Sequence, residues 1–127
     1  MAINGKNKER TKMNKNKLVF YDKENDILAI HKGFTSDEKF KGNIDAGQIV
    51  LDVSTKGRIR GIEIMNATEF FESCNIEKEV LENIEDAKFN VSVNPNGIIL
   101  GIGLKAKNRK EEIPATIAVP LEVPIKR

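Results

Sequence analysis

Two acidic side chains, Asp52 and Glu63, form the best candidate pair for chemistry in this chain. They lie in neighbouring stretches whose apolar residues alternate, which predicts two strands joined by a turn at residues 56–57. With that turn, Leu51 lies opposite Ile62, and the two carboxylates occupy diagonal positions on the other face, roughly 6–8 Å apart. This spacing suits an acid/base pair or a weak metal site. We favour the alternative interpretation, a solvated face that carries charges at alternate positions.

His31 is the only histidine, and with Asp52 and Glu63 it completes the set of three candidate catalytic residues. A histidine acts as a general base when a partner orients it and a nucleophile lies within reach. Serines and Cys74 are present, but no flanking motif marks any of them as an activated nucleophile. We therefore interpret His31 as a polar residue at a strand end and Cys74 as a residue that packs a helix.

A glycine motif, Gly101-x-Gly103-x-x-Ala106, follows an apolar run. In a dinucleotide-binding fold, such glycines open a helix whose N-terminus holds a pyrophosphate. Residues 107–114 lack an apolar helical stripe, and the alternation of apolar residues continues through both glycines. The motif therefore predicts a strand and no cofactor, with one thin face that a helix or a second subunit can approach closely.

Cysteine and histidine usage predicts no metal site. Cys74 cannot form an internal disulfide, and no cluster of Cys and His residues is present to hold zinc.

No apolar run approaches the ~20 residues of a membrane helix, and the Lys- and Asn-rich start does not resemble a signal peptide. We expect a cytoplasmic protein without membrane contact.

Basic residues are concentrated in residues 1–17, which contain six cations and one acid, for a net charge of +5. The other 110 residues contain 15 basic and 18 acidic residues, for a net charge of −3. We predict that 1–17 is a disordered tail, because it has almost no apolar residues to bury.

The cations of this tail are candidates for nucleic-acid binding by counterion release, without base readout. These candidates are Lys6, Lys8, Arg10, Lys12, Lys15 and Lys17. The alternative is a solubilising segment, or a start placed too early, since translation from Met13 would remove most of it.

Periodicity divides residues 18–127, which we expect to form a single α+β domain, into three parts. Residues 18–67 show period-two stretches near 18–21, 26–31, 49–53 and 59–64. The acidic segment 68–86 predicts two short helices, near 67–73 and 76–85, with Asn75 as the N-cap of the second. Residues 87–127 predict a meander of three antiparallel strands. The expected fold is thus an antiparallel sheet from two strand groups, joined by one or two short helices.

Prolines indicate that the last strand lies at an edge of the sheet. Pro114, Pro120 and Pro124 stand at positions of the same parity, so their missing N–H groups fall on one side of an extended strand. A strand tolerates this loss where that side faces solvent. Leu121, Val123 and Ile125 continue the apolar parity, as the end of the core face or as a strip that binds a partner.

The residues of the first part also follow a known pattern. It opens with Tyr-Asp-x-x-x-Asp-x-Leu-x-Ile at Tyr21–Ile30, continues with Asp52 in the third strand, and ends with Gly-Ile-Glu-Ile-x-Asn-Ala at Gly61–Ala67. This series resembles a small prokaryotic family, domain of unknown function 2283, over about residues 18–67. The chain departs from it at Ala29, where the family often has an aromatic residue, and at Lys56, where an acid often precedes the glycine.

The resemblance implies a small strand-rich protein without an established activity. Some relatives lie beside genes for short toxin-like proteins that cleave RNA, which implies an antitoxin-like role. The region from Thr68 onward resembles an extension of archaeal-type members. Three hypotheses follow: a non-enzymatic module that binds a protein partner or a second copy, a nucleic-acid-binding protein that uses residues 6–17, and a small enzyme that uses Asp52, Glu63 and His31.

Overall fold

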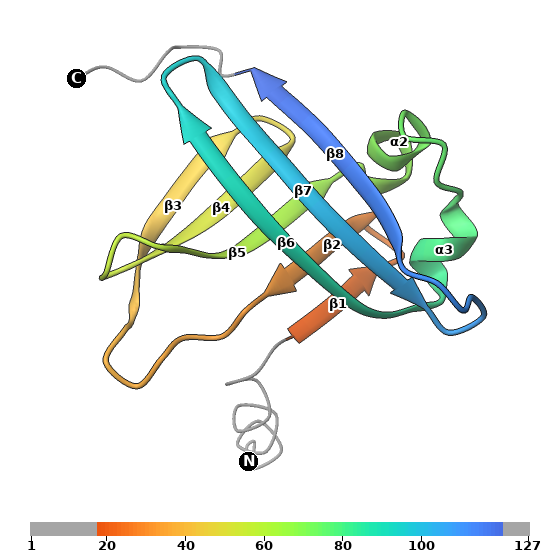
Figure 1. The fold of residues 1–127 in the computed structure, drawn as a ribbon, viewed down its shortest axis with the longest axis horizontal. Helices are drawn as coiled ribbons and strands as arrows, with labels where there is room; N and C mark the ends of the chain where they lie inside the picture. Colours follow the sequence, from red (N-terminus) through yellow and green to blue (C-terminus); the bar gives the residue numbers. More distant parts are fainter. Residues whose placement is uncertain (1–17, 121–127) are drawn as a thin grey trace.

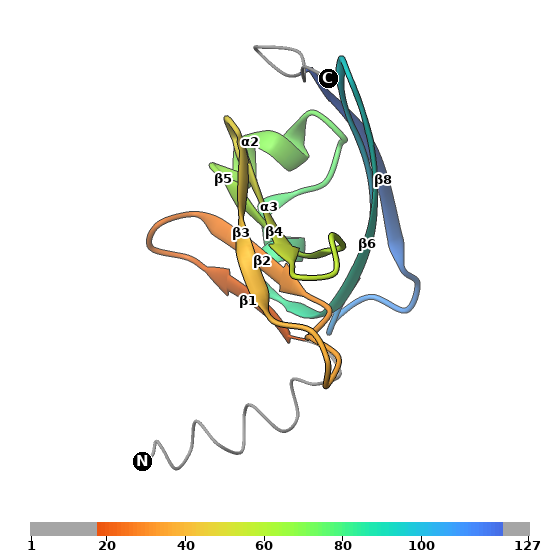
Figure 2. The ribbon, with the colours of Figure 1, turned by 90° about the vertical axis from the view of Figure 1, so that its left-hand side faces the viewer.

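Two antiparallel β-sheets lie face to face in the computed structural model, which describes residues 18–120 (Figures 1 and 2). The first sheet has five strands in the order β1-β2-β5-β4-β3, and the second has three in the order β6-β7-β8. The first sheet consists of β1 (Leu18–Asp22), β2 (Ile27–His31), β3 (Phe40–Ala46), β4 (Ile49–Ser54) and β5 (Ile59–Met65). The second consists of β6 (Ile84–Asn94), β7 (Gly97–Ala106) and β8 (Ile113–Pro120). The helices α2 (Ala67–Glu72) and α3 (Lys78–Glu82) connect them.

The expectation of an α+β fold is wrong, and the protein is closer to all-β. Strands account for 57% of the structure and helices for 11%. Both helices are shorter than predicted, because Asn75 adopts a left-handed conformation (φ 61°) after α2 instead of capping α3, whose N-cap is Glu77. At the other end, Ile84 already begins β6. The acidic segment thus contributes two short helical connections and no helical layer.

The first sheet has the register that the alternation predicts. In the β4–β5 hairpin, Leu51 lies opposite Ile62 and Ile49 lies opposite Ile64. All four side chains are buried, so one face of the sheet is apolar. The hairpin turn contains Gly57 at a φ of 77°, a left-handed conformation that favours glycine.

The second sheet confirms the predicted meander. β6 pairs with β7 and β7 pairs with β8, both antiparallel. Among the described strands, β8 has β7 as its sole neighbour, so it lies at an edge, and Pro114 and Pro120 are exposed there. Because proline cannot donate to a ladder, these residues discourage a further strand from pairing at this edge.

The hydrophobic core fills the space between the two sheets. Apolar side chains of β2, β4 and β5 meet those of β6 and β7 in one cluster, which the two helices complete. Phe71 of α2 is the largest fully buried side chain. Cys74 packs against this cluster, as expected. Helices α2 and α3 lie beside the sheets at the right of Figure 1.

Three predicted features lie outside the described residues: the basic tail 1–17, Pro124, and the apolar strip of Leu121, Val123 and Ile125. Among residues 18–120, no helix is long and apolar enough to cross a membrane.

Candidate functional site

Strand pairing aligns four residues in a row on the face of the first sheet that points away from the core. His31 of β2 lies opposite Gly61 of β5, Gly61 lies opposite Asp52 of β4, and Asp52 lies opposite Asn43 of β3. Two of the three predicted catalytic residues, His31 and Asp52, therefore share one row. The residue between them is the one that has no side chain.

Gly61 lets the histidine and the aspartate approach across a whole strand. His31 Nε2 lies 4.0 Å from Asp52 Oδ2, and both side chains are about one-quarter exposed. A Cβ atom at Gly61 would come within 2.7 Å of Asp52 Oδ2 and would also collide with the His31 ring. Asn43 Nδ2 donates to Asp52 Oδ1 at 2.6 Å and orients the carboxylate from the other side. The arrangement is Asn43–Asp52–His31 above a glycine backbone.

The hydrogen bonds of His31 define what its ring can do. The backbone N–H of Gly33 donates to Nδ1 at 2.8 Å, so Nδ1 is an acceptor and the ring proton lies on Nε2, toward Asp52. Burial lowers the pKa of His31 below its ordinary value of 6.5, which leaves the imidazole neutral at pH 7. A neutral ring with Nδ1 occupied and Nε2 protonated has no free lone pair. This geometry does not suit a general base.

Glu63 lies apart from this pair. It stands opposite Ala29 and Val50, so its position relative to Asp52 is diagonal, as the predicted register requires. Its side chain is exposed. Among residues 18–120, no group of three or more His, Cys, Asp or Glu side chains could hold a metal ion. The catalytic role of the three residues stays a prediction.

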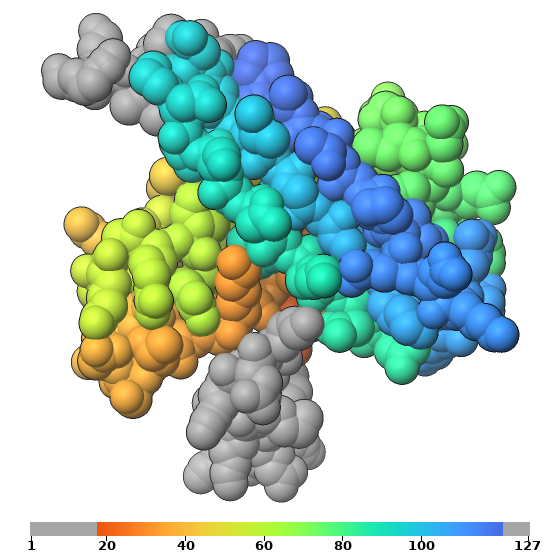
Figure 3. Space-filling model, in the orientation of Figure 1, coloured from red at the N-terminus to blue at the C-terminus, as the bar shows by residue number. Residues whose placement is uncertain are grey.

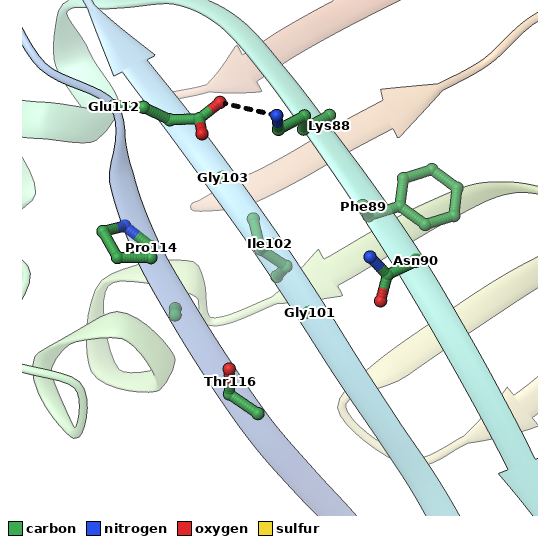
Figure 4. Close-up of a pocket in the computed structure, with 10 residues that line it drawn as sticks. Lys88, Phe89, Asn90, Gly101, Ile102, Gly103, Glu112, Pro114 and Thr116 are labelled. Carbon is green, nitrogen blue, oxygen red and sulfur yellow. Dashed lines mark ion pairs between the residues drawn. The ribbon is translucent and has the colours of Figure 1, made fainter.

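A second candidate site is a hollow on the outer face of the second sheet, which faces the viewer in Figure 3 (Figure 4). It encloses about 260 Å³ above Gly101 and Gly103 of β7. The Glu112 carboxylate lies against Gly103, where it would be 2.8–3.1 Å from an added Cβ, and Lys88 Nζ lies 3.4 Å from Glu112 Oε2. The Asn90 side chain lies against Gly101 in the same way. The thin face that the sequence predicts is therefore partly filled by the protein's own polar side chains.

Two charged segments that the sequence places apart meet in the structure. Glu79 of α3 accepts hydrogen bonds from Asn108 Nδ2 at 2.6 Å and from Arg109 Nη2 at 2.9 Å. The Asn108 bond, followed by the Arg109 bond, lowers the pKa of Glu79. Glu82 pairs with Lys23, with 3.6 Å between Oε2 and Nζ. Part of the acidic helical segment is thus neutralised within the chain.

Sequence reasoning missed Glu38, the buried carboxylate in the segment between β2 and β3. Its side chain is fully buried, and it accepts hydrogen bonds from Arg58 Nε at 2.9 Å and Nη2 at 3.0 Å. Arg60 Nε lies 3.7 Å from its Oε1. The Arg58 hydrogen bonds hold the pKa of Glu38 far below its usual range. Since 20 or more residues separate the partners, local spacing contains no signal for this contact.

The edge of the first sheet at β1 is another feature without a clear sequence signal. Leu18 and Phe20, on one face of β1, are 37% and 58% exposed. A hollow of about 320 Å³ lies beside this strand, between it and the junction of α3 with β6. Its lining consists of Val19, Phe20, Tyr21, Lys23, Leu81, Glu82 and Ile84. The sequence indicated this exposed edge only through the apolar residues on both faces of β1.

The fold and these surfaces are those of a small protein of two packed antiparallel sheets, in which polar side chains lie over glycines of the strands. The chain belongs to the family described as Protein of unknown function (DUF2283), whose model matches residues 18–67, as the resemblance implies. It is 34% identical over 96 residues to an uncharacterised protein of Methanocaldococcus jannaschii, an alignment that covers 75% of this chain and 78% of that protein.

A second relative, from Methanosarcina mazei, is 31% identical over 91 residues, which cover 72% of this chain and 69% of the relative. That protein is named a putative hypoxanthine phosphoribosyltransferase. No solved structure matches the chain significantly.

Proposed function

We propose that this protein is a non-enzymatic interaction module that binds a protein partner by strand addition at β1. The supporting observation is that β1 is a free edge of the first sheet with exposed apolar side chains. Within the described residues β1 pairs with β2 alone, and it exposes Leu18 and Phe20. An edge strand presents unpaired N–H and C=O groups to which an extended segment can add.

The other edges differ from β1 in how far they are protected. β8 contains Pro114 and Pro120, which cannot donate to a new ladder. In β3 the register shifts between Phe40 and Gly42, and such a bulge twists an edge away from new partners. β1 contains no proline and its pairing with β2 is regular. β6, the other edge of the second sheet, also lacks proline, but its register shifts within residues 84–86 and its first five residues include three charged ones, which oppose pairing with a further strand. β1 is therefore the edge best suited to accept a further strand.

The hollow beside β1 provides the specificity. Successive side chains of an added strand point to opposite faces. One set would contact the exposed side of Phe20, and the other set would enter the hollow lined by Leu81 and Ile84. An antitoxin-like role is the form of this proposal that the family resemblance implies. A basic partner is favoured because the acidic segment 68–86, which contains seven acids and one base, borders this hollow.

The test compares two exposed phenylalanines on opposite edges of one sheet. Phe20 is 58% exposed on β1 and Phe40 is 52% exposed on β3. We expect wild type and Phe40→Lys to capture the same stoichiometric protein from a nuclease-treated extract of the source organism, identified by mass spectrometry. Phe20→Lys should reduce that capture at least tenfold, because an edge lysine opposes strand addition. Equal capture by both variants, or a wild-type protein that is monomeric and without a partner, contradicts the proposal.

Nucleic-acid binding through Lys6, Lys8, Arg10, Lys12, Lys15 and Lys17 stays a prediction, since these residues lie outside the described part. A salt-titrated binding assay on the full chain and on a chain that starts at Met13 tests it. Tight, salt-dependent binding by the full chain alone would support this function. Equally weak binding by both would exclude it.

The transferase named for the Methanosarcina relative is less well supported for this chain. Transfer of a phosphoribosyl group requires a site for phosphates, and the glycine motif is the sequence feature nearest to one. Gly101 and Gly103 lie inside β7, paired with Asn90 and Lys88 of β6, and open no helix. An assay for phosphoribosyl transfer to hypoxanthine tests this possibility directly.

A further inference from the structure

The segment between β2 and β3, residues 32–39, is fastened at both of its ends. At the far end, the buried carboxylate of Glu38 binds Arg58. At the near end, Gly33 is held through both its N–H and its C=O. Its N–H donates to His31 Nδ1 at 2.8 Å, and its C=O accepts from Arg60 Nε at 2.8 Å. Gly33 has a φ of 83°, so the chain turns sharply at this residue.

Charged groups from three elements face the His31 ring. Asp52 of β4 lies 4.0 Å from Nε2, Arg60 comes from β5, and Glu38 comes from the segment itself. The neutral contacts are Gly61 beneath the ring and Phe34, whose ring meets His31 edge-on at 4.9 Å between centroids. Burial and Arg60 oppose a positive charge on His31, whereas Asp52 and Glu38 favour one. Burial has the largest effect, which is why the resting state is the neutral ring.

We propose that His31 is a pH-sensitive latch, and that its protonation releases the N–H of Gly33 and so loosens the near end of residues 32–39. A proton added to a neutral ring whose Nε2 already carries hydrogen must go to Nδ1. Nδ1–H would then face the N–H of Gly33, and two donors cannot share a hydrogen bond. The imidazolium gains an attraction to Asp52 on its other side. The ring and the N–H of Gly33 therefore separate, while Arg60 keeps its bond to the C=O of Gly33 and Glu38 keeps the far end in place through Arg58.

A contact with the second sheet lies next to Gly33 in the sequence. Lys32, between His31 and Gly33, places its Nζ 4.4 Å from the centre of the Phe89 ring of β6. This cation–π contact is one of the interactions between the first sheet and the second. The backbone of Lys32 is itself paired with β5, because its N–H donates to the C=O of Arg60 at 2.7 Å. Mild acid should therefore loosen the chain from Gly33 onward and leave the contact between Lys32 and Phe89 in place.

The experiment is an NMR pH titration of the ¹⁵N-labelled full chain from pH 8 to pH 5. Because His31 is the only histidine, its ring signals report its titration without ambiguity. We expect a midpoint below 6.5, a Gly33 amide signal that moves with the same midpoint, and a protection factor for Gly33 that falls by about fivefold. Gly57, whose N–H donates to the backbone C=O of Ser54 at 2.8 Å, is the control amide and should not respond. A Gly33 amide that does not follow His31 overturns the proposal.

Two variants separate the latch from a general effect of acid. Asp52→Asn removes the anion that favours the imidazolium, so the midpoints of His31 and Gly33 should move together to lower pH. His31→Gln keeps an acceptor near Gly33 but cannot titrate, so the Gly33 transition should disappear. Midpoints that separate in Asp52→Asn, or a Gly33 transition that persists in His31→Gln, would show that another group controls the segment. Asp52→Asn leaves the His31 ring in contact with Gly61 and Phe34 and keeps its hydrogen bond to Gly33. It therefore tests the proposal even if His31→Gln does not fold.

Discussion

The carboxylate of Asp26 accepts hydrogen bonds from both the backbone N–H and the hydroxyl of Thr68, 42 residues further along the chain, at 3.0 and 2.8 Å from its Oδ1. Thr68 lies in the first turn of α2, whose own N-cap residue, Asn66, makes no side-chain capping bond. The backbone C=O of Asp26 also accepts from the N–H of Ala67 at 2.9 Å. Asp26, in the turn between β1 and β2, thus caps α2 from a distant part of the sequence.

This capping predicts the effect of Asp26→Asn on stability. Asparagine tolerates the left-handed conformation of residue 26 (φ 56°), so the substitution mainly removes the charge that the helix N-terminus prefers. We expect the free energy of unfolding in urea to fall by about 1 kcal/mol. Glu24→Ala, in the same turn and exposed, should change it by less than about 0.5 kcal/mol. Equal effects of the two substitutions would mean that Asp26 does not cap α2.

Glu38→Gln tests whether the buried carboxylate anchors residues 32–39. The amide would leave Arg58 and Arg60 without their buried anion, so we expect the Tm to fall by several degrees. Asp37→Asn is the matched control, because Asp37 is exposed and its pair with Lys56 has little influence on stability. A Tm that falls equally in both variants would show that Glu38 has no special role. The pKa of Glu38 is far below its ordinary value, so its contribution should persist down to about pH 4.5 and be lost as the pH falls further.

The two sheets show which parts of the structure the sequence could predict and which it could not. Alternation predicted the β4–β5 register and the β6–β8 meander, because burial of one face constrains both. It missed β3, an edge strand in which Ile44 is the one large apolar side chain turned partly toward the core. The approach of His31 to Asp52 was also out of reach. It depends on β2 and β4 lying on either side of β5, and the order of strands in a sheet leaves no periodic signal.

Gly61→Ala should disturb the outer face of the first sheet. The added Cβ would collide with His31 and lie 2.7 Å from Asp52 Oδ2, so both side chains must move. We expect a loss of about 2 kcal/mol in the free energy of unfolding, measured in urea. Gly42→Ala in β3 is the control, since nothing lies within 4 Å of a Cβ placed there. If Gly42→Ala were as damaging as Gly61→Ala, glycine flexibility would explain the loss better than the space above Gly61.

The titration of His31 should make the stability of the protein depend on pH, and His31→Gln should remove this dependence. The pKa of His31 is lowered by burial in the folded protein, so the unfolded chain, with an ordinary pKa of 6.5, takes up the proton first as the pH falls. Stability should therefore be complete above about pH 7.5 and decrease as the pH falls through 6.5, with a slope of at most about 1.4 kcal/mol per pH unit for one proton.

The carboxylates Glu38 and Asp26 do not contribute in this window. Burial alone would raise the pKa of Asp26, but hydrogen bonds from Tyr21 and Thr68 outweigh it and lower the pKa. The pKa of Glu38 is lowered as well, so both groups weaken the fold only in stronger acid. Urea unfolding at pH 7.5, 6.5 and 5.5 should show a steady loss for wild type and a flat profile for His31→Gln. An identical slope in the two proteins would assign the pH dependence to other groups and would show that the proton affinity of His31 does not change on folding.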